Sequence, residues 1–377
     1  MSAAPNLFYI AELHLLQFKN YAHTQLTLGS GVHLISGKNG AGKTNLLDAI
    51  YYLCCCKSYF QASDAANIQH ETNFFRLDGT FCLHQSDNNN GNEKITVKCS
   101  PRKKEISRNG SVYERLSEHV GLLPLVIITP DDTELIKGSS EERRKLIDLN
   151  LSQLDHPYLQ ALIRYNKLIQ QRNALLKQFA ELNYFDASLL DTYDAQLIAP
   201  AQLLHQKRQA LTQAISPFLQ HYYALLSNGS EAVSCTYKSE LNQNHFADIL
   251  KKQQYKDRDA QRTTQGLHRD DWTFEMDGHP LKKFGSQGQQ KSFLIALKLA
   301  LYRLLHQQKG ISPLLLLDDV FDKLDPQRIA QLSQIITTPP FGQVLMTDTQ
   351  SERMAQTLQN LHINYTLIKV QNGEIVV

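Results

Sequence analysis

The sequence predicts an α/β fold: a head with a mixed sheet, helices and an antiparallel sheet, split by an inserted compact α-helical lobe. Three observations carry this prediction. A glycine-rich loop at 37–44 lies between an apolar strand and a helix. A run of four leucines at 314–317 ends in two acids. Between them, residues 139–226 have helical spacing and almost no glycine.

Composition limits the classes of protein to consider. The chain has 377 residues and 42% hydrophobic content, enough for two or three globular domains. No apolar run approaches the ~20 residues of a membrane span, and the first residues lack a signal core, so we expect a cytoplasmic protein. A net charge of +2 is too small to indicate nucleic-acid binding by itself. None of the six cysteines has Cys-x-x-Cys spacing, which disfavours zinc.

Short strands are predicted along the first third of the chain. Residues 7–18 and 24–36 alternate in polarity, with a turn at 29–31. Residues 74–114 alternate again and predict an antiparallel sheet of hairpins, with the basic run 101–110 at a hairpin tip. Residues 125–129 form a further short apolar run before Pro130.

The glycine-rich loop is predicted to bind phosphate. It fits the pattern G-x-x-x-x-G-K-S/T through Gly37, Lys38, Asn39, Gly40, Ala41, Gly42, Lys43 and Thr44. The glycines let backbone N–H groups face an anion, and the following helix N-terminus adds partial positive charge. We therefore expect ATP, with Lys43 on its β- and γ-phosphates and Thr44 on Mg²⁺. A chance glycine-rich turn is the alternative, which the flanking strand and helix disfavour.

The helical region is expected to form an insertion. Pro157, Pro200 and Pro217 should divide it into several helices. A hairpin of roughly 90 helical residues would reach only about 65 Å, and no heptad pattern persists over many turns. We therefore expect a compact lobe rather than a long coiled-coil arm. The predicted head spans 1–130 and 235–377, and the predicted lobe spans 131–234.

The second half of the site is predicted at the leucine run, which is typical of a strand buried on both faces of a parallel sheet. Asp318 should hold Mg²⁺ as the Walker B acid, and Asp319 should position the attacking water. Together with Lys43, these two acids are the predicted catalytic residues. A solvated strand end or helix cap is the alternative for Asp319. Asp325 is suited to cap the next helix.

A polar loop at 284–292 opens a helical run at 293–305. Such a loop is commonplace alone, but upstream of the double acid it resembles the signature motif of ABC-type ATPases through Ser286, Gln287, Gly288 and Gln289. That resemblance implies an ABC-type head in which the signature of one subunit closes over ATP held by another. One loop and one signature per chain then imply an ATP-dependent homodimer.

Six segments taken in order resemble the RecF family, which is related to the SMC proteins. They are 18–21 (F-R/K-N-Y), 128–130 (I-T-P), 143–148 (R-R-x-F/L-I/L-D), 171–176 (Q-R-N-x-L-L), 266–271 (G-P-H-R-D-D) and 286–289 (S-Q-G-Q). The chain departs from the family at Leu267, where proline is usual, and at Asp322, which alters the segment called the D-loop. The switch histidine of transporters is absent. Thr347 and Asp348 are candidates to sense the γ-phosphate there, and slow hydrolysis is expected.

The resemblance adds Lys19, Asn20, Gln69 and Asp325 to the expected nucleotide-binding residues, with Gln69 as the Q-loop residue. A polar surface residue is the alternative for Gln69.

The resemblance also implies a weak ATPase that acts as a recombination mediator or clamp in DNA repair and replication. The expected DNA is a single-stranded gap, a junction of single-stranded with double-stranded DNA, or duplex. ATP binding would join two heads, and hydrolysis would release them. RecR, RecO and the recombinase are the implied protein partners.

Candidates for DNA contact are weak. The densest basic run supplies Arg102, Lys103, Lys104 and Arg108, although a solvated hairpin surface explains it equally well. Aromatic residues interleaved with cations, which would stack unpaired bases, are not evident in the sequence. His268 with Asp270 and Asp271 could hold a metal, but structural hydrogen bonds or ion pairs are favoured.

Two other functions are considered. The nucleotide-binding subunit of an ABC transporter is disfavoured by the missing switch histidine and the long helical insertion. A small-molecule P-loop kinase would leave residues 286–289 unexplained and needs an acceptor pocket that no segment supplies.

Overall fold

The structure, a computed structural model, describes residues 7–84, 91–227, 229, 231–349 and 351–376. Its packing divides the chain into two compact units. The head unit comprises Met1–Asp132, Tyr222–Ser230 and Leu294–Val377, and the helical unit comprises Thr133–His221 and Glu231–Phe293. Residues 235–293, predicted for the head, pack in the helical unit, where β9 and β10 pair and β10 contacts α3.

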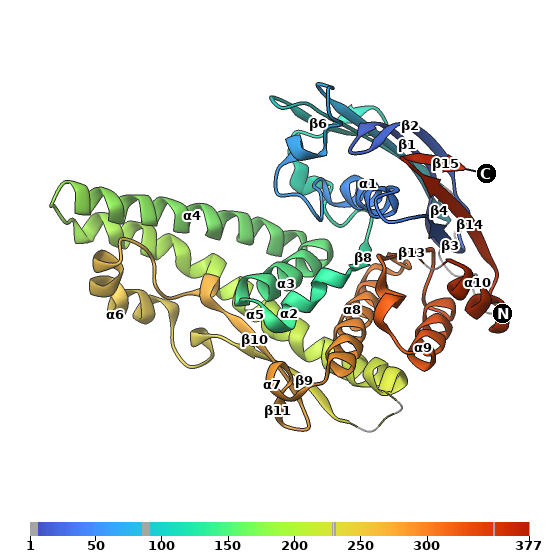
Figure 1. Cartoon of the computed structure of the whole chain (residues 1–377). Helices are drawn as coiled ribbons and strands as arrows, with labels where there is room; N and C mark the ends of the chain where they lie inside the picture. Colours follow the sequence, from blue (N-terminus) through green and yellow to red (C-terminus); the bar gives the residue numbers. More distant parts are fainter. Residues whose placement is uncertain (1–6, 85–90, 228, 230, 350, 377) are drawn as a thin grey trace. The chain divides into compact units, whose positions relative to one another are not determined.

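An antiparallel sheet of six strands forms one layer of the head unit (Figure 1). Its order is β2 (Tyr21–Thr27), β1 (Leu7–Phe18), β4 (Phe75–His84), β5 (Gly91–Cys99), β6 (Lys104–Arg108) and β7 (Ser111–Val112). β1 buries alternate residues, and a register shift between Ile10 and Glu12 resets the alternation so that Leu13 and Leu15 are also buried. The basic run is therefore not one hairpin tip, because Lys104–Arg108 is a paired strand between two turns.

A mixed sheet of six strands forms the second layer of the head unit. Its order is β15 (Glu374–Val376), β14 (Tyr365–Gln371), β3 (Val32–Ser36), β13 (Val344–Asp348), β12 (Leu314–Leu317) and β8 (Leu125–Ile128). All neighbours are parallel except β14 and β15. Every residue of β3, β8, β12 and β13 is buried, as expected for central parallel strands with both faces covered. The predicted α/β fold class is confirmed.

Helix α1 (Lys43–Cys55) lies between the two layers of the head unit. It contacts β1, β4 and β5 of one sheet and β8 and β13 of the other, so it is buried on nearly all sides. The helices α9 (Pro326–Thr337) and α10 (Ser351–Asn360) complete this unit. Cys54, Cys55 and Cys56 are buried at the end of α1 and form no disulfide. Burial raises the pKa of the Cys55 and Cys56 thiols to about 12, so both are unreactive thiols.

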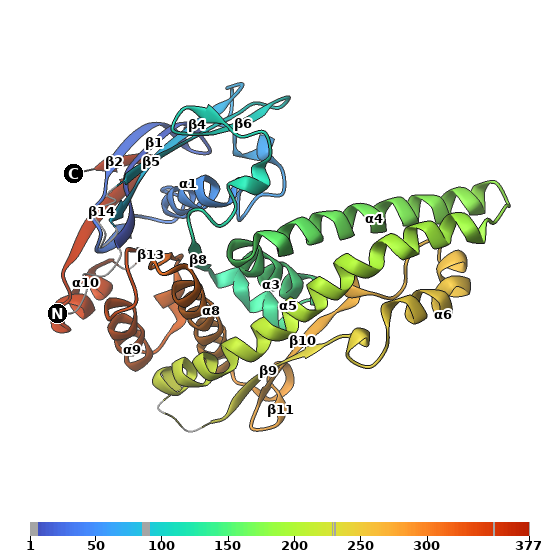
Figure 2. The same ribbon diagram turned by 180° about the vertical axis from the view of Figure 1, so that it is seen from behind.

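The helical unit is built from long helices and a small sheet. Its helices are α2 (Glu134–Lys137), α3 (Ser140–Leu154), α4 (His156–Glu181), α5 (Ala187–Ser227), α6 (Phe246–Asp259) and α7 (Leu281–Phe284), and its strands are β9 (Val233–Lys238), β10 (Asp271–Met276) and β11 (His279–Pro280). Figure 2 shows α4 and α5 side by side as a hairpin, with α6 beside its distal end. The end of α5 and most of α8 (Gln287–Lys309) belong to the head unit.

Prolines affect the helices differently from the prediction. Pro157 begins α4 as expected, because proline is tolerated in a first turn. Pro200 and Pro217 do not break the chain, and both lie inside the 41 residues of α5. That helix is about 62 Å long at ~1.5 Å per residue. Among the described residues, no helix is long and apolar enough to cross a membrane.

Candidate nucleotide-binding site

The phosphate loop connects β3 to α1. Gly40 and Gly42 have φ values of 78° and 120°, which residues with a side chain rarely adopt. A Cβ on Gly37 would lie 2.3 Å from the Val370 carbonyl oxygen of β14. The Lys43 ammonium is folded onto the loop and donates to the carbonyl oxygens of Gly37 (2.9 Å) and Lys38 (3.4 Å). These carbonyls hold the ammonium at the loop, where a phosphate could replace them.

The two predicted acids meet the loop through a chain of hydrogen bonds. The Thr44 hydroxyl contacts both oxygens of Asp318, at 2.9 and 3.1 Å. The buried Thr347 hydroxyl donates to Asp318 (2.8 Å) and accepts from the Asp319 backbone N–H (2.8 Å). Burial raises the pKa of Asp318, the nearby Asp319 raises it further, and the two threonine hydroxyls oppose this shift. Thr44, Asp318 and Asp319 thus form one oxygen-rich cluster.

Lys19 is held by a buried acid that the sequence did not single out. Its ammonium lies 2.6 Å from a carboxylate oxygen of Asp48, whose side chain is fully buried in α1. Asp48 also accepts from the Ser58 hydroxyl (2.6 Å) and the Tyr59 N–H (2.8 Å). Lys19 itself has a φ of 53° and is nearly buried. Because Asp48 looks like one more helix residue, no local pattern could have identified it.

Asn20 links the phosphate loop to the hairpin of β14 and β15. Its amide nitrogen donates to the Ala41 carbonyl (3.0 Å), and its amide oxygen accepts from Asn45 (2.7 Å). The Gly373 N–H, in the turn between β14 and β15, donates to the same Ala41 carbonyl (2.9 Å). Two donors from distant segments therefore fix the middle of the loop.

Gln69 lies close to Lys19 and Asn20 rather than on a separate surface. The three residues line one open hollow of about 610 Å³, together with Asn45 and Gln61. The backbone of Gln69 donates to the Gln17 carbonyl (2.9 Å), which fixes this segment beside β1. The structure therefore brings the predicted loop residues 37–44, Lys19, Asn20, Gln69, Asp318 and Asp319 together in the head unit.

The signature segment begins α8 in the helical unit. The Ser286 hydroxyl accepts from the Gln289 N–H (3.2 Å), and the Gln289 amide oxygen accepts from the Ser286 N–H (2.7 Å). This reciprocal pair is a capping box. Ser286 and Gln287 are exposed, and Gly288 is half-buried. The loop thus presents an exposed helix N-terminus, in which the Ser286 and Gln289 N–H groups are used by the capping box.

Asp325 caps α9, accepting from the Arg328 N–H at 3.0 Å, as its position predicted. Asp348 is buried at the end of β13. The side chain of Asp322 lies outside the described residues. Asp319 has left-handed backbone angles, φ 45° and ψ 33°, two residues after the end of β12. This turn ends the path of β12 beside the cluster of Thr44, Asp318 and Asp319.

The predicted DNA-contacting cations are mostly neutralised. Lys103 pairs with Glu105 (2.8 Å), Lys104 with Asp64 (2.9 Å), and Arg108 with Glu93 (2.5 Å). Arg102 is exposed. Because three of the four cations have carboxylate partners, this segment attracts phosphate less strongly than its sequence suggests.

Two buried arginines organise the helical unit through ion pairs. Arg172 pairs with Asp194 (2.6 Å) and Asp257 (2.7 Å). Arg208 pairs with Asp148 (2.9 Å) and Asp270 (2.8 Å). The His268 ring nitrogens contact the Thr263 carbonyl oxygen (3.0 Å) and the Tyr165 hydroxyl (3.2 Å). In the described ranges, no group of three His, Cys, Asp or Glu side chains could hold a metal ion.

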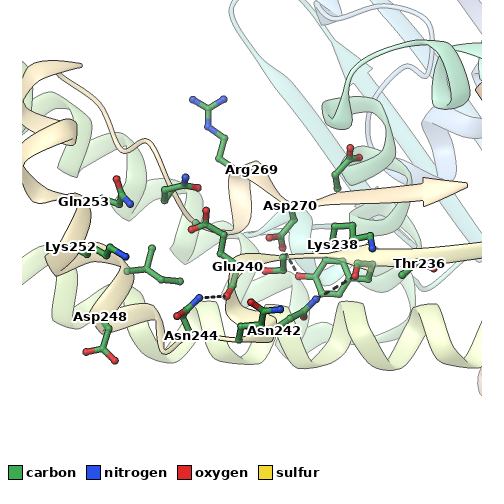
Figure 3. Close-up of a pocket in the computed structure, with 17 residues that line it drawn as sticks. Thr236, Lys238, Glu240, Asn242, Asn244, Asp248, Lys252, Gln253, Arg269 and Asp270 are labelled. Carbon is green, nitrogen blue, oxygen red and sulfur yellow. Dashed lines mark hydrogen bonds between the residues drawn. The ribbon is translucent and has the colours of Figure 1, made fainter. Parts of the chain in front are cut away.

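A polar hollow of about 790 Å³ lies in the helical unit, between β9, α6 and the segment 265–271 (Figure 3). It carries cations of Lys238, Lys252 and Arg269, but also Glu240 and Asp248. Charges of both signs are mixed along its wall, so its chemistry selects no single ligand class.

Comparison with known proteins gives consistent matches over nearly the whole chain. The family of the RecF/RecN/SMC N-terminal domain matches residues 9–374. The DNA replication and repair protein RecF of Flavobacterium johnsoniae is 40% identical over 96% of this chain and 100% of that protein. The RecF protein of Cytophaga hutchinsonii is 40% identical over 97% of this chain and 96% of that protein.

Solved structures agree with these matches. A structure of the recombination mediator protein RecF with ATP, described as part of the RecFOR pathway, is 26% identical with a TM-score of 0.88, covering 100% of this chain and 99% of that one. The Smc head domain of Pyrococcus furiosus is 17% identical with a TM-score of 0.56, covering 98% and 96%. The second likeness concerns the fold alone.

Proposed function

The chain belongs to the RecF family, within the RecF/RecN/SMC proteins, and we propose that it is an ATP-dependent DNA-binding recombination mediator in DNA repair and replication. The observation that carries this proposal is the hydrogen-bonded connection of the phosphate loop to two acids through Thr44 and Thr347. A relative of the same family was solved with ATP, which supports ATP as the ligand here.

The residues present fit Mg²⁺-ATP. Thr44 and Asp318 supply the hydroxyl and carboxylate oxygens that Mg²⁺ prefers, and they already lie within 2.9 Å of each other. When bound there, Mg²⁺ would neutralise charge on the phosphates. The loop N–H groups and Lys43 would bind the phosphates, while Asn20 and Gln69 would border the rest of the nucleotide from the adjoining hollow.

The acids divide the catalytic work. Asp319 is half-buried and offers its carboxylate to orient a water molecule, with its backbone fixed by Thr347. Asp318 has no such freedom, because two threonine hydroxyls hold it against the loop. We expect weak hydrolysis, since Thr347 and Asp348 stand where a transporter would place histidine. Asp319→Asn should bind ATP and hydrolyse it poorly.

Each chain contributes half of a composite site in this proposal. The exposed helix N-terminus at Ser286 and Gly288 would direct its partial positive charge towards the γ-phosphate of ATP held by a second copy. ATP binding would join two chains on DNA, and hydrolysis would release them.

The proposed DNA is a single-stranded gap or its junction with duplex. Exposed Arg102 is the least neutralised cation of the basic run and would contact a phosphate. RecR, RecO and a recombinase are the proposed protein partners.

Complementation between inactive variants tests the composite site. Lys43→Ala and Ser286→Arg should each abolish hydrolysis alone. Their mixture should regain activity, because one of its two sites combines an intact loop with an intact signature. The Asp319→Asn protein should also double its mass in light scattering when Mg²⁺-ATP is added. An inactive mixture together with an ATP-insensitive mass would refute the dimer.

DNA dependence separates this function from a transporter subunit or a metabolite kinase. ATP hydrolysis by the purified chain should increase with gapped DNA, and binding to gapped, duplex and single-stranded DNA should be compared with and without ATP. Hydrolysis that is indifferent to all three, or a phosphorylated small-molecule product, would contradict the proposal.

A further inference from the structure

The distal end of the helical unit carries exposed aromatic rings that no role above explains. Tyr255 on α6 is 80% exposed, and Tyr184, in the loop between α4 and α5, is 59% exposed. They line one hollow of about 290 Å³, together with Phe179, Phe185 and Arg258. The two tyrosines are 71 residues apart in the sequence, so no local pattern could have revealed their proximity.

The floor of this hollow is rigid. Phe179 contacts Phe185 edge to face at 5.3 Å and Tyr184 at 6.3 Å. The Arg258 guanidinium lies 3.9 Å from the Phe185 ring centre, so it presents a flat cationic surface. Phe179 packs on the buried cluster of Leu175, Leu176 and Leu190. The Tyr184 ring therefore packs on this support, while the Tyr255 ring lines the same hollow and is more exposed.

Tyr255 also lies within a basic stripe of α6. Lys251, Tyr255 and Arg258 follow i, i+4, i+7 spacing on one helix face, and Lys252 and Lys256 flank them. The three lysines are exposed and form no ion pair within the described part of the chain. The exposed acids of the helix are Asp248 and Asp259, since Asp257 is buried against Arg172. Asp259 lies one turn from Tyr255 and lines the same hollow. Cations thus outnumber acids around the ring.

We propose that this surface, defined by Tyr184, Tyr255 and the α6 stripe, binds single-stranded nucleic acid, with unpaired bases stacked on the tyrosines and phosphates on the lysines. Charge complementarity selects a polyanion, and exposed ring faces select bases that are not already stacked. Duplex hides its base faces and would use the lysines alone. The inference rests on the proposed DNA binding and supplies it with a means to recognise the unpaired strand of a gap.

Fluorescence anisotropy of the full chain with a labelled oligo-dT strand tests this proposal. Tyr255→Ala should weaken binding by about fivefold to a hundredfold, the range for one lost stacking partner. Tyr255→Phe keeps the ring and should stay within about twofold of the unchanged protein. Neither variant should alter binding to duplex of equal length or hydrolysis without DNA, because the side chain is exposed and lies outside the nucleotide site.

Two further measurements separate stacking from charge and from protein contacts. Lys252→Ala with Lys256→Ala should reduce the salt slope of single-strand binding by about 1.4, for two phosphate contacts. A 5-iodouracil strand should cross-link to the peptide holding Tyr184 or Tyr255. Equal oligo-dT affinity for Tyr255→Ala and Tyr255→Phe would overturn the proposal. Changed self-association with unchanged oligo-dT binding would also overturn it, by assigning the surface to a second copy. If the unchanged protein binds no DNA at all, the proposed function itself fails.

Discussion

Single residues decide how the phosphate loop is held. Lys43, Thr44 and Asp318 could be identified from contiguous patterns, because their roles follow from fixed spacing. Asp48 and Gly373 required the fold, since each contacts a partner from a distant segment. The sequence therefore indicates the candidate phosphate-binding residues more readily than the residues that support them.

Gly373 should matter to ATP binding although it lies far from the loop in sequence. A Cβ there would fall 2.2 Å from the Asn20 carbonyl oxygen, at a φ of 78°. We expect Gly373→Ala to displace Asn20 and Ala41 and to weaken ATP binding about tenfold, or ~1.4 kcal/mol. Gly110→Ala is the matched control, because φ there is 86° and nothing lies within 4 Å. Equal ATP affinities of the two variants, measured by calorimetry, would exclude this supporting role.

His268 should make stability depend on pH. Burial lowers its pKa to about 4, so the folded chain binds this proton less readily than the unfolded chain. The stabilisation is complete above about pH 6.5 and is lost as the pH falls towards 4, by up to about 3 kcal/mol. His268→Gln cannot titrate and should flatten the stability profile between pH 7 and 4. An unchanged slope in urea denaturation would assign the acid sensitivity to other groups.

At the scale of elements, the sequence identified the strands and helices better than their limits. The strand, loop and helix around residues 32–55 were predictable because local periodicity and glycine placement agree. The continuity of α5 through Pro200 and Pro217 was not, because proline's local penalty is overridden by packing that only the folded chain possesses. The aromatic hollow could not be predicted either, because only the folded chain brings Tyr184 and Tyr255 to one hollow.

Pro217 should cost α5 stability that a simple substitution recovers. It is exposed in the helix interior, where it removes one hydrogen bond to Gln213. Pro217→Ala should therefore stabilise the protein by about 1–3 kcal/mol. Gln213→Ala changes the same exposed turn without changing the backbone and should have little effect. Thermal unfolding of the two variants gives the comparison, and a lowered midpoint for Pro217→Ala would contradict the predicted cost of this proline.

Arg172 should hold α4, α5 and α6 together. Its guanidinium is fully buried and pairs with Asp194 and Asp257. Arg172→Leu leaves two acids without their partner and should destabilise the unit by about 3–5 kcal/mol. Arg172→Lys keeps the charge and should recover part of this loss. Urea denaturation followed by Trp272 fluorescence measures both, and a loss below about 1 kcal/mol for Leu would contradict the inference.

At the scale of the molecule, the two compact units should respond differently to nucleotide. The single tryptophan, Trp272, is buried in the helical unit, with its ring nitrogen donating to Thr212 at 2.8 Å. The nucleotide site lies in the head unit. If the units unfold independently, ATP at 100 times its Kd should stabilise the head by about 2.7 kcal/mol and leave the tryptophan transition unchanged.

Circular dichroism and tryptophan fluorescence, recorded in the same thermal scan, provide the test. The circular dichroism transition should split or move upward with Mg²⁺-ATP, and Lys43→Ala should remove that response. Identical upward shifts of both signals would show instead that the chain unfolds as one cooperative body. The predicted boundaries at 130 and 235 would then have no thermodynamic meaning.

The pairing of β14 with β3 has a consequence for biosynthesis. β3, which leads into the phosphate loop, pairs with β14, and Ala41 of the loop accepts a hydrogen bond from Gly373. A ribosome adds these partner residues, 365–373, more than 320 residues after the strand. A nascent chain that stops short of this segment has the whole glycine motif but lacks a strand neighbour and one donor to its loop. Nucleotide capture should therefore begin only once translation has passed this point.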